Sequence, residues 1–305
     1  MKRLTLFVSA FALAVCSVAA QEHILWYDRP AMTWTQALPV GNGRLGGMVF
    51  GNPGVERVQL NEETIWAGQP NFSLNPKAKA TLPKVRQLIA EGKYREAQAL
   101  ADDGIMPGSR LNSGMPYQTF GDLYIAMPGQ GAYSNYRREL SLDSALSTVT
   151  YTAGGVDYRR ETIATLGQGD NVIAVRLTAS KPGKITFTAS LTSPHHDVII
   201  RSEGAHVVLN GVTSRHEGVK SLVRFQGRMA VDVRGGTVAS EGGVLSVSGA
   251  DEAVVYVAIA TNVVNYHDVS ADEALRTRSA IDDAMKKGYA ALRSAHIGVF
   301  TGYMN

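Results

Sequence analysis

The chain offers carboxylates for acid–base chemistry, but their spacing does not single out a catalytic pair. Hydrolysis of a glycosidic bond usually needs one carboxyl group as acid and a second as base or nucleophile, roughly 5 to 10 Å apart. Among 27 acidic residues, the most suggestive neighbours are Glu62 and Glu63. Adjacent strand residues face opposite sides of a sheet, so at most one of them can point into a given site. A solvated or turn-capping glutamate is the alternative interpretation for either residue.

The three tryptophans, Trp26, Trp34 and Trp66, all lie in the first 66 residues of the chain. Sugars present apolar C–H faces that pack on aromatic rings, and their hydroxyls pair with nearby polar groups. Residues 61–63, Asn-Glu-Glu, come shortly before Trp66 and could supply such groups. The pattern is compatible with a carbohydrate site, and the alternative is that the tryptophans belong to the core or to an interface.

Two further motifs suggest chemistry that their context does not support. Residues 41–46 spell G-x-G-x-x-G, but a dinucleotide site needs a helix after the glycines, and the strand-like residues 47–51 follow here. We therefore expect a tight turn.

His195, His196 and Asp197 could suggest a metal, yet neighbouring strand residues diverge and no second cluster has ligand spacing. We expect neither a metal site nor a cofactor.

The first twenty residues predict a cleaved signal peptide. Lys2 and Arg3 form a positive start, and residues 4–15 are apolar but too few to span a bilayer. Small residues at 18–20 suit a cleavage site, which predicts a mature chain from Gln21 in the periplasm or outside the cell.

The remaining bulk properties exclude several classes of function. Cys16 is the only cysteine and lies in the expected signal peptide, so the mature chain would carry no disulfide. Lipidation of Cys16 is an alternative to cleavage after residue 20, but Val15 is a poor residue before a lipidated cysteine. The formal net charge is only +3 and no basic run occurs, which argues against nucleic acid. No later segment has eighteen consecutive apolar residues, so we expect no membrane segment after cleavage.

The hydrophobic pattern from residue 122 to 260 predicts strands throughout. Residues 171–179 and 185–191 alternate between two faces, and residues 253–260 are continuously apolar, as in a strand covered on both sides. Glycine-rich turns separate these runs. The sequence thus predicts a mainly β protein in which two large sheets pack together.

Helical patterns occur in two places. Residues 76–101 predict a short helical insertion, with a break at Gly92. Near the C-terminus, Ser270 and Glu273 have the spacing of a capping box, with Ser270 as the N-cap. Apolar residues then fit one helix face; they are Leu275, Ile281, Met285, Tyr289 and Leu292. We divide the chain into a signal peptide at 1–20, a β domain at 21–268 and a helical linker at 269–305.

Several segments resemble glycoside hydrolase family 95, in the order that the family shows. The two longest are WTQALPVGNGRLGGMVFG at 34–51 and ERVQLNEETIWAG at 56–68. The others are VRQLIAEGKYREA at 85–97, YQTFGDLY at 117–124, YRRELSLD at 136–143 and VDYRRE at 156–161.

This resemblance implies a fold and an activity. The family is known chiefly for α-L-fucosidases, with some members acting on α-L-galactosides, and it combines an N-terminal β-supersandwich, a helical linker, an (α/α)6 catalytic barrel and a small C-terminal β domain. It inverts the anomeric centre: a glutamic acid protonates the leaving oxygen, and asparagine with aspartate activates a water. Those residues belong to the barrel and none maps here, so we expect the catalytic groups beyond Asn305 and a chain truncated before the barrel.

The expected ligands are fucosylated or related glycans, and the expected protein partner is the missing barrel or another chain. The alternatives are a non-catalytic carbohydrate-binding or domain-docking module and a fragment without function. Loops beside short strands carry the residues that we expect at the rim of the substrate site. These are Trp34, Asn42, Arg44, Asn61, Glu62 and Trp66.

Overall fold

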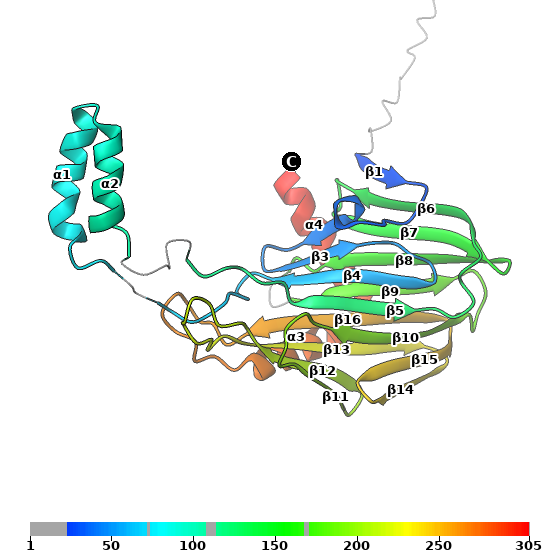
Figure 1. The fold of residues 1–305 in the computed structure, drawn as a ribbon. Helices are drawn as coiled ribbons and strands as arrows, with labels where there is room; N and C mark the ends of the chain where they lie inside the picture. The colour runs from blue at the N-terminus through cyan, green and yellow to red at the C-terminus, as the bar shows by residue number, and fades with distance from the viewer. Residues whose placement is uncertain (1–22, 72–73, 108–113, 168–170, 305) are drawn as a thin grey trace, which may run out of the picture.

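The computed structural model describes residues 23–71, 74–107, 114–167 and 171–304; the expected signal peptide with Cys16, and Asn305, lie outside these ranges. Its strands form two antiparallel sheets stacked face to face, which confirms the predicted β-sandwich (Figure 1). No helix in the described part of the chain is long and apolar enough to cross a membrane.

The larger sheet has nine strands in the order β1-β6-β7-β8-β9-β16-β13-β12-β11. Their bounds, in that order, are Ile24–Tyr27, Ser134–Ser141, Leu146–Ala153, Val156–Ala164, Ile173–Ala179, Glu252–Thr261, Arg224–Arg234, His206–Val212 and Ile199–Glu203.

The smaller sheet has seven strands in the order β14-β15-β10-β5-β4-β3-β2. Their bounds, in that order, are Thr237–Glu241, Val244–Ala250, Ile185–Thr192, Gly121–Ala126, Val55–Glu62, Leu45–Val49 and Leu38–Gly41.

Strands β9 and β16 show how the sequence sorts side chains between two cores. On β9, Ile173 and Val175 enter the main core between the sheets, whereas Ala174, and Val172 just before the strand, face a second core under the C-terminal helices. Residues 253–260 of β16 alternate in the same way and are all buried. The predictions of alternation in β9 and of a doubly covered strand in β16 are therefore confirmed.

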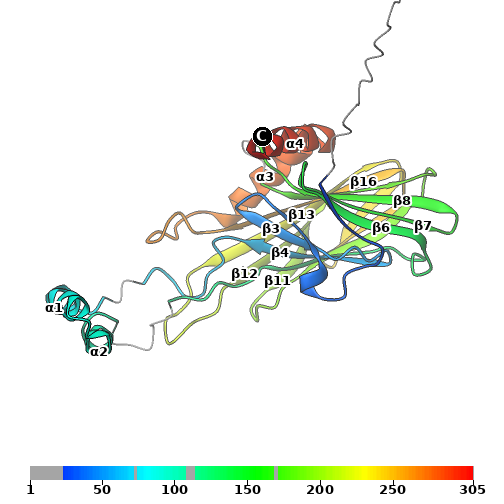
Figure 2. The ribbon, with the colours of Figure 1, turned by 90° about the horizontal axis from the view of Figure 1, so that it is seen from above.

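A helical hairpin projects from one end of the sandwich, where the sequence predicted an insertion (Figures 1 and 2). Its helices are α1, Ala78–Ala90, and α2, Tyr94–Gly104. They bury Val85, Leu88 and Ala97 in a small core of their own.

The C-terminal segment forms two helices on the outer face of the nine-stranded sheet, α3 at Glu273–Lys287 and α4 at Tyr289–Met304 (Figure 2). The sequence analysis expected the apolar residues from Leu275 to Leu292 to lie on one face of a single helix, and this expectation is wrong on two points. Gly288 ends α3 with a φ of 74°, a conformation that glycine adopts without strain. Leu275 is exposed, while Ile281 and the later apolar residues pack on the sheet.

The predicted N-cap of α3 is also wrong. Asp272 caps the helix, because its Oδ1 accepts a hydrogen bond from the backbone N–H of Leu275 at 2.9 Å. Ser270 instead lies in the preceding turn, where its N–H donates to Asp268. Aspartate caps a helix as well as serine does, so residue type alone does not decide between Ser270 and Asp272.

His296 attaches α4 to the nine-stranded sheet. Its side chain is 1% exposed, and Nε2 lies 3.2 Å from the carbonyl oxygen of Ala145. Nδ1 has no hydrogen-bond partner in the described structure. Burial lowers the pKa of His296, and the charge of Arg293 acts in the same direction, although nearby carbonyls oppose them.

We predict that acid weakens the fold partly through His296. Because its folded pKa lies below the unfolded value near 6.5, the unfolded state binds the proton first. The stabilisation is present above that unfolded pKa and is lost as the pH falls through the folded pKa. Urea denaturation at pH 7.5 and 5.0 should show a smaller loss of stability for His296→Gln than for the wild type, with exposed His267→Gln as control. Equal losses in all three proteins would contradict this role.

Candidate functional site

A pocket of about 790 Å³ lies at the end of the sandwich from which the helical hairpin projects. Its wall is formed by the β2–β3 turn, the chain after β4, residues 114–115 before β5, Val223 before β13, the loop after β16 and the first turn of α3. The wall combines aromatic, charged and amide side chains, the kind of lining that holds a polar ligand with apolar faces. They are Trp66 and Tyr266, Arg44, Glu63 and Arg276, and Gln69, Asn71 and Asn265.

The glycine motif at 41–46 forms the hairpin turn between β2 and β3. Gly41 pairs with Gly46, and Gly43 has a φ of 87°. Strand β3 follows the glycines instead of a helix, so a phosphate would find no helix N-terminus here. The predicted tight turn is confirmed.

Asn42 fixes this turn and thereby positions Arg44. Its Oδ1 accepts from the backbone N–H of Arg44 at 3.0 Å and of Leu45 at 2.6 Å. Its Nδ2 donates to the carbonyl of Thr165 and to Oδ1 of Asn171, which tie the turn to the β8–β9 connection of the other sheet. These bonds use both acceptor sites and both donors of the amide. Asn42 is therefore a positioning residue.

Glu62 is the last residue of β4 and Glu63 follows it. The expected divergence of their side chains is not seen, because both carboxylates lie near the Arg44 guanidinium, at 2.7 and 3.4 Å. Glu62 is fully buried; its Oε1 lies 2.7 Å from Nη2 of Arg44, an ionic contact whose angles fall outside those of a hydrogen bond. Its Oε2 accepts from the N–H and the hydroxyl of Thr64 at 2.8 and 2.7 Å. Burial raises the pKa of Glu62, while Thr64 and Arg44 oppose that rise. Glu63 is exposed in the pocket wall.

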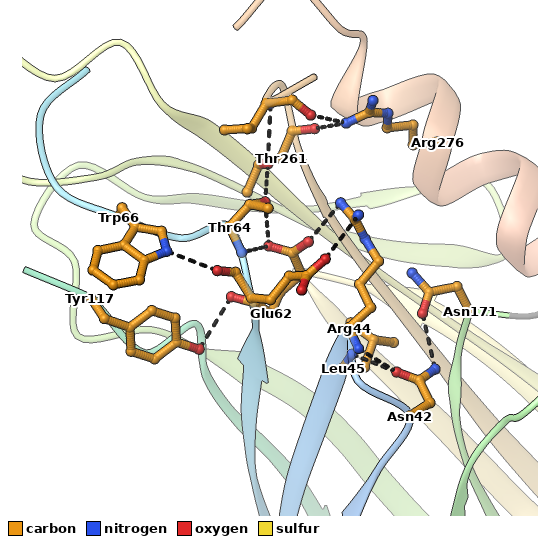
Figure 3. A network of polar contacts seen from close by, with 12 residues as sticks. Asn42, Arg44, Leu45, Glu62, Thr64, Trp66, Tyr117, Asn171, Thr261 and Arg276 are labelled. Atoms are coloured by element: carbon orange, nitrogen blue, oxygen red, sulfur yellow. Dashed lines mark hydrogen bonds and ion pairs between the residues drawn. The ribbon is translucent and has the colours of Figure 1, made fainter. Parts of the chain in front are cut away.

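The network continues from Thr64 into the other sheet and α3. Because the Thr64 hydroxyl donates to Glu62, the Thr261 hydroxyl on β16 must donate to Thr64. Nη1 of Arg276 on α3 donates to the carbonyls of Thr261 and Val263 at 2.8 and 2.7 Å. Both sheets and the first C-terminal helix are thus joined behind the pocket (Figure 3).

Trp66 and Tyr117 form an edge-to-face ring pair beside the pocket. Their centroids are 5.5 Å apart and the planes meet at 70°. Trp66 Nε1 donates to the carbonyl of Glu63, and the Tyr117 hydroxyl lies 3.2 Å from both Asn61 Oδ1 and the carbonyl of Glu62. Burial and the charges of Glu62 and Glu63 raise the pKa of Tyr117, which keeps its phenol protonated.

Five of the six predicted rim residues thus meet at this end of the molecule, and the sixth does not join them. Trp34 lies in a short 3-10 turn, Trp34–Gln36, where its exposed side chain is part of neither the network nor the pocket wall. Sequence reasoning missed Tyr117 and Arg276. Tyr117 lies in the segment 117–124 that resembles the family, which could have pointed to it, whereas Arg276 gave no local signal.

A second hollow, of about 490 Å³, holds Glu161 and Glu252 near the start of α4. Arg176 binds Glu252 with Nε at 2.6 Å and Glu161 with Nη1 at 3.3 Å. The hydrogen bond from Arg176 lowers the pKa of Glu252. Burial would raise the pKa of Glu161, but Arg159 and the neighbouring arginines lower it. A general acid needs a raised pKa, so this pair is unsuited to that role.

The two neighbouring histidines that could suggest a metal lie in the loop between β10 and β11, not on a strand as expected from the sequence. His195 is buried, with Nε2 3.0 Å from the carbonyl of Thr119 and its ring 4.8 Å from that of Phe225. His196 and Asp197 are exposed. In the described part of the chain, no three His, Cys, Asp or Glu side chains are grouped to hold a metal ion.

Comparison with known families defines the class of this two-sheet sandwich: an N-terminal domain of a glycoside hydrolase. The chain belongs to the family described as glycosyl hydrolase family 65, N-terminal domain, whose model matches residues 25–266.

Curated relatives carry α-fucosidase names. The chain is 32% identical to "Alpha-L-fucosidase 2" of Arabidopsis thaliana, over 92% of this chain and 36% of that protein. It is 29% identical to "Probable alpha-fucosidase A" of Aspergillus niger, over 98% of this chain and 40% of that protein. The chain therefore spans well under half the length of these relatives.

A solved structure, a putative kojibiose phosphorylase from the human microbiome, shares the fold. The TM-score is 0.52 at 10% identity, and the match covers 91% of this chain and 37% of the other. At this identity the likeness concerns the fold alone.

Proposed function

We propose that this chain is the N-terminal domain of an exported hydrolase of the α-L-fucosidase type, glycoside hydrolase family 95. The whole enzyme would remove terminal α-L-fucosyl or α-L-galactosyl residues with inversion. The observation that carries the proposal is the end pocket. Arg44 and Trp66 line it, and a network of hydrogen bonds and an ion pair beside them joins both sheets and α3. The names of the curated relatives support the sugar class.

Within the pocket, we assign contact and positioning to different residues. Trp66 offers a ring for the C–H face of a sugar, and Arg44 offers guanidinium donors for its hydroxyls. Asn61 lies beside them and adds an amide. Asn42 and Glu62 hold Arg44 in place, because their polar atoms are engaged inside the protein. Trp34 has no role in this pocket.

We propose that the catalytic acid and the residues that activate water are supplied from outside residues 23–304. Among the described residues, the pocket wall contains one carboxylate, Glu63, whereas hydrolysis usually needs two. In the second hollow, Glu161 and Glu252 are both paired with Arg176. The purified chain should therefore release no aryl group from an aryl α-L-fucoside. Release that persists in preparations of an Arg44→Ala, Glu63→Ala variant would point to contamination, and release that these substitutions abolish would contradict the proposal.

Trp66→Ala should weaken binding of methyl α-L-fucoside by about five- to tenfold, the worth of one aromatic contact. Isothermal titration of the full chain measures this change. Trp26→Ala is the matched control, because Trp26 is also exposed but lies on β1, outside the pocket wall. Equal weakening by the two substitutions would place the sugar elsewhere.

Export is a separate part of the proposal and rests on the N-terminal sequence. The chain expressed with its own leader in a Gram-negative host should be recovered from the periplasm with a mass that starts at Gln21. Recovery of the uncleaved chain from the cytoplasm would contradict it.

A further inference from the structure

We infer that Trp66 and Tyr117 form a shelf next to the pocket that holds a second sugar residue. This inference rests on the proposed function, and it extends the ligand from a single terminal sugar to a neutral oligosaccharide. Nothing in the sequence patterns singled out Tyr117 as a contact residue.

The shelf is exposed although it consists of large aromatic rings. Trp66 is 46% and Tyr117 42% exposed, so neither ring is explained by the core. Trp66 belongs to the pocket wall, whereas Tyr117 does not. The ring pair therefore leads from the pocket to the surface beside it (Figure 3).

The polar end of each ring is anchored. The indole N–H of Trp66 is bound to the carbonyl of Glu63, and the phenol of Tyr117 to Asn61 and the carbonyl of Glu62. The backbones are joined as well, since Trp66 and Tyr117 form a β-bridge. A ligand would meet rings whose orientation is already set, which reduces the entropy lost on binding.

The chemistry of the shelf fits a glycan chain. Two rings inclined at 70° can pack against the C–H faces of two successive pyranose units. Asn61 Oδ1 accepts from Tyr117, and among the described hydrogen bonds none uses Asn61 Nδ2, so two N–H groups remain for a sugar hydroxyl. A second pyranose on Tyr117 would thus find both an apolar face and a polar partner.

The test compares two probes on the full chain by isothermal titration: methyl α-L-fucoside and a fucosyl trisaccharide. We expect the trisaccharide to bind about five- to tenfold more tightly, the worth of one further aromatic contact. Tyr117→Ala should remove this advantage, so that the variant binds the two probes with equal affinity. Tyr117→Phe should keep part of it. Tyr303→Ala, which removes an exposed tyrosine from α4, serves as control.

The outcomes separate this inference from the proposal beneath it. Equal affinity for both probes, or an advantage that survives Tyr117→Ala, overturns the shelf and leaves the pocket intact. Absence of binding by either probe to the wild-type chain overturns the pocket and the shelf with it. Circular dichroism of Tyr117→Ala and Tyr117→Phe establishes that a lost advantage does not come from unfolding.

Discussion

Glu62→Ala should abolish sugar binding and lower the free energy of unfolding by about 1.5–3 kcal/mol, the range for hydrogen bonds to charged groups. The substitution removes the carboxylate that both Thr64 and Arg44 contact, so the chain between β4 and Trp66 loses its anchor. Among the described contacts, the Arg44 guanidinium would keep the longer ion pair with Glu63, 3.4 Å from Nη1. Urea denaturation and titration with methyl α-L-fucoside measure the two effects.

Glu63→Ala is the control for the loss of stability. Its carboxylate is exposed, and surface substitutions of this kind usually change stability by about 0.5 kcal/mol or less. Glu62→Gln, which preserves the shape and one acceptor oxygen, should fall between the two. If Glu62→Ala bound sugar like the wild type, Glu62 would not position the site.

Glu56→Ala should destabilise the fold even more than Glu62→Ala, lowering the free energy of unfolding by about 3–5 kcal/mol, as when one partner of a buried ion pair is removed. Glu56 on β4 and Arg160 on β8 meet at 2.8 Å, and each side chain is 2% exposed. Glu56 also accepts from the backbone N–H of Gly51 at 2.7 Å. The pair links the two sheets, and its loss leaves a guanidinium buried without a carboxylate.

The matched control is Glu139→Ala, whose partner Arg137 lies 2.7 Å away on the same strand in a partly exposed position. Such a pair contributes about 0–1 kcal/mol. Guanidinium denaturation of both variants gives the comparison. Similar losses for Glu56→Ala and Glu139→Ala would show that burial does not govern the strength of these pairs.

The sheets could be predicted because strand patterns are local. The alternation in β9 and the apolar run of β16 depend only on which faces are covered, and both predictions are confirmed. The prediction of the N-cap of α3 was wrong because Ser270 and Asp272 can both cap a helix and lie within one turn of each other. Only the surrounding packing decides between them.

The candidate site could be predicted only in part, for a related reason. Arg44, Asn61 and Trp66 lie in two neighbouring hairpin segments, so their proximity follows from local sequence. Arg276 reaches the same place from α3, more than two hundred residues after Trp66, through pairing across both sheets. No spacing rule links such positions. Trp34 is the opposite case: it lies only ten residues before Arg44 in the sequence, yet it is not part of the pocket wall.

The central claim is that sugar binds at the end pocket beside Trp66. The chain has three tryptophans, so its indole N–H groups give three side-chain signals in a ¹⁵N-correlated NMR spectrum. Titration with methyl α-L-fucoside should shift the Trp66 signal, assigned by Trp66→Phe, and leave those of Trp26 and Trp34 in place. A titration that shifts Trp26 or Trp34 while Trp66 stays fixed would contradict the claim.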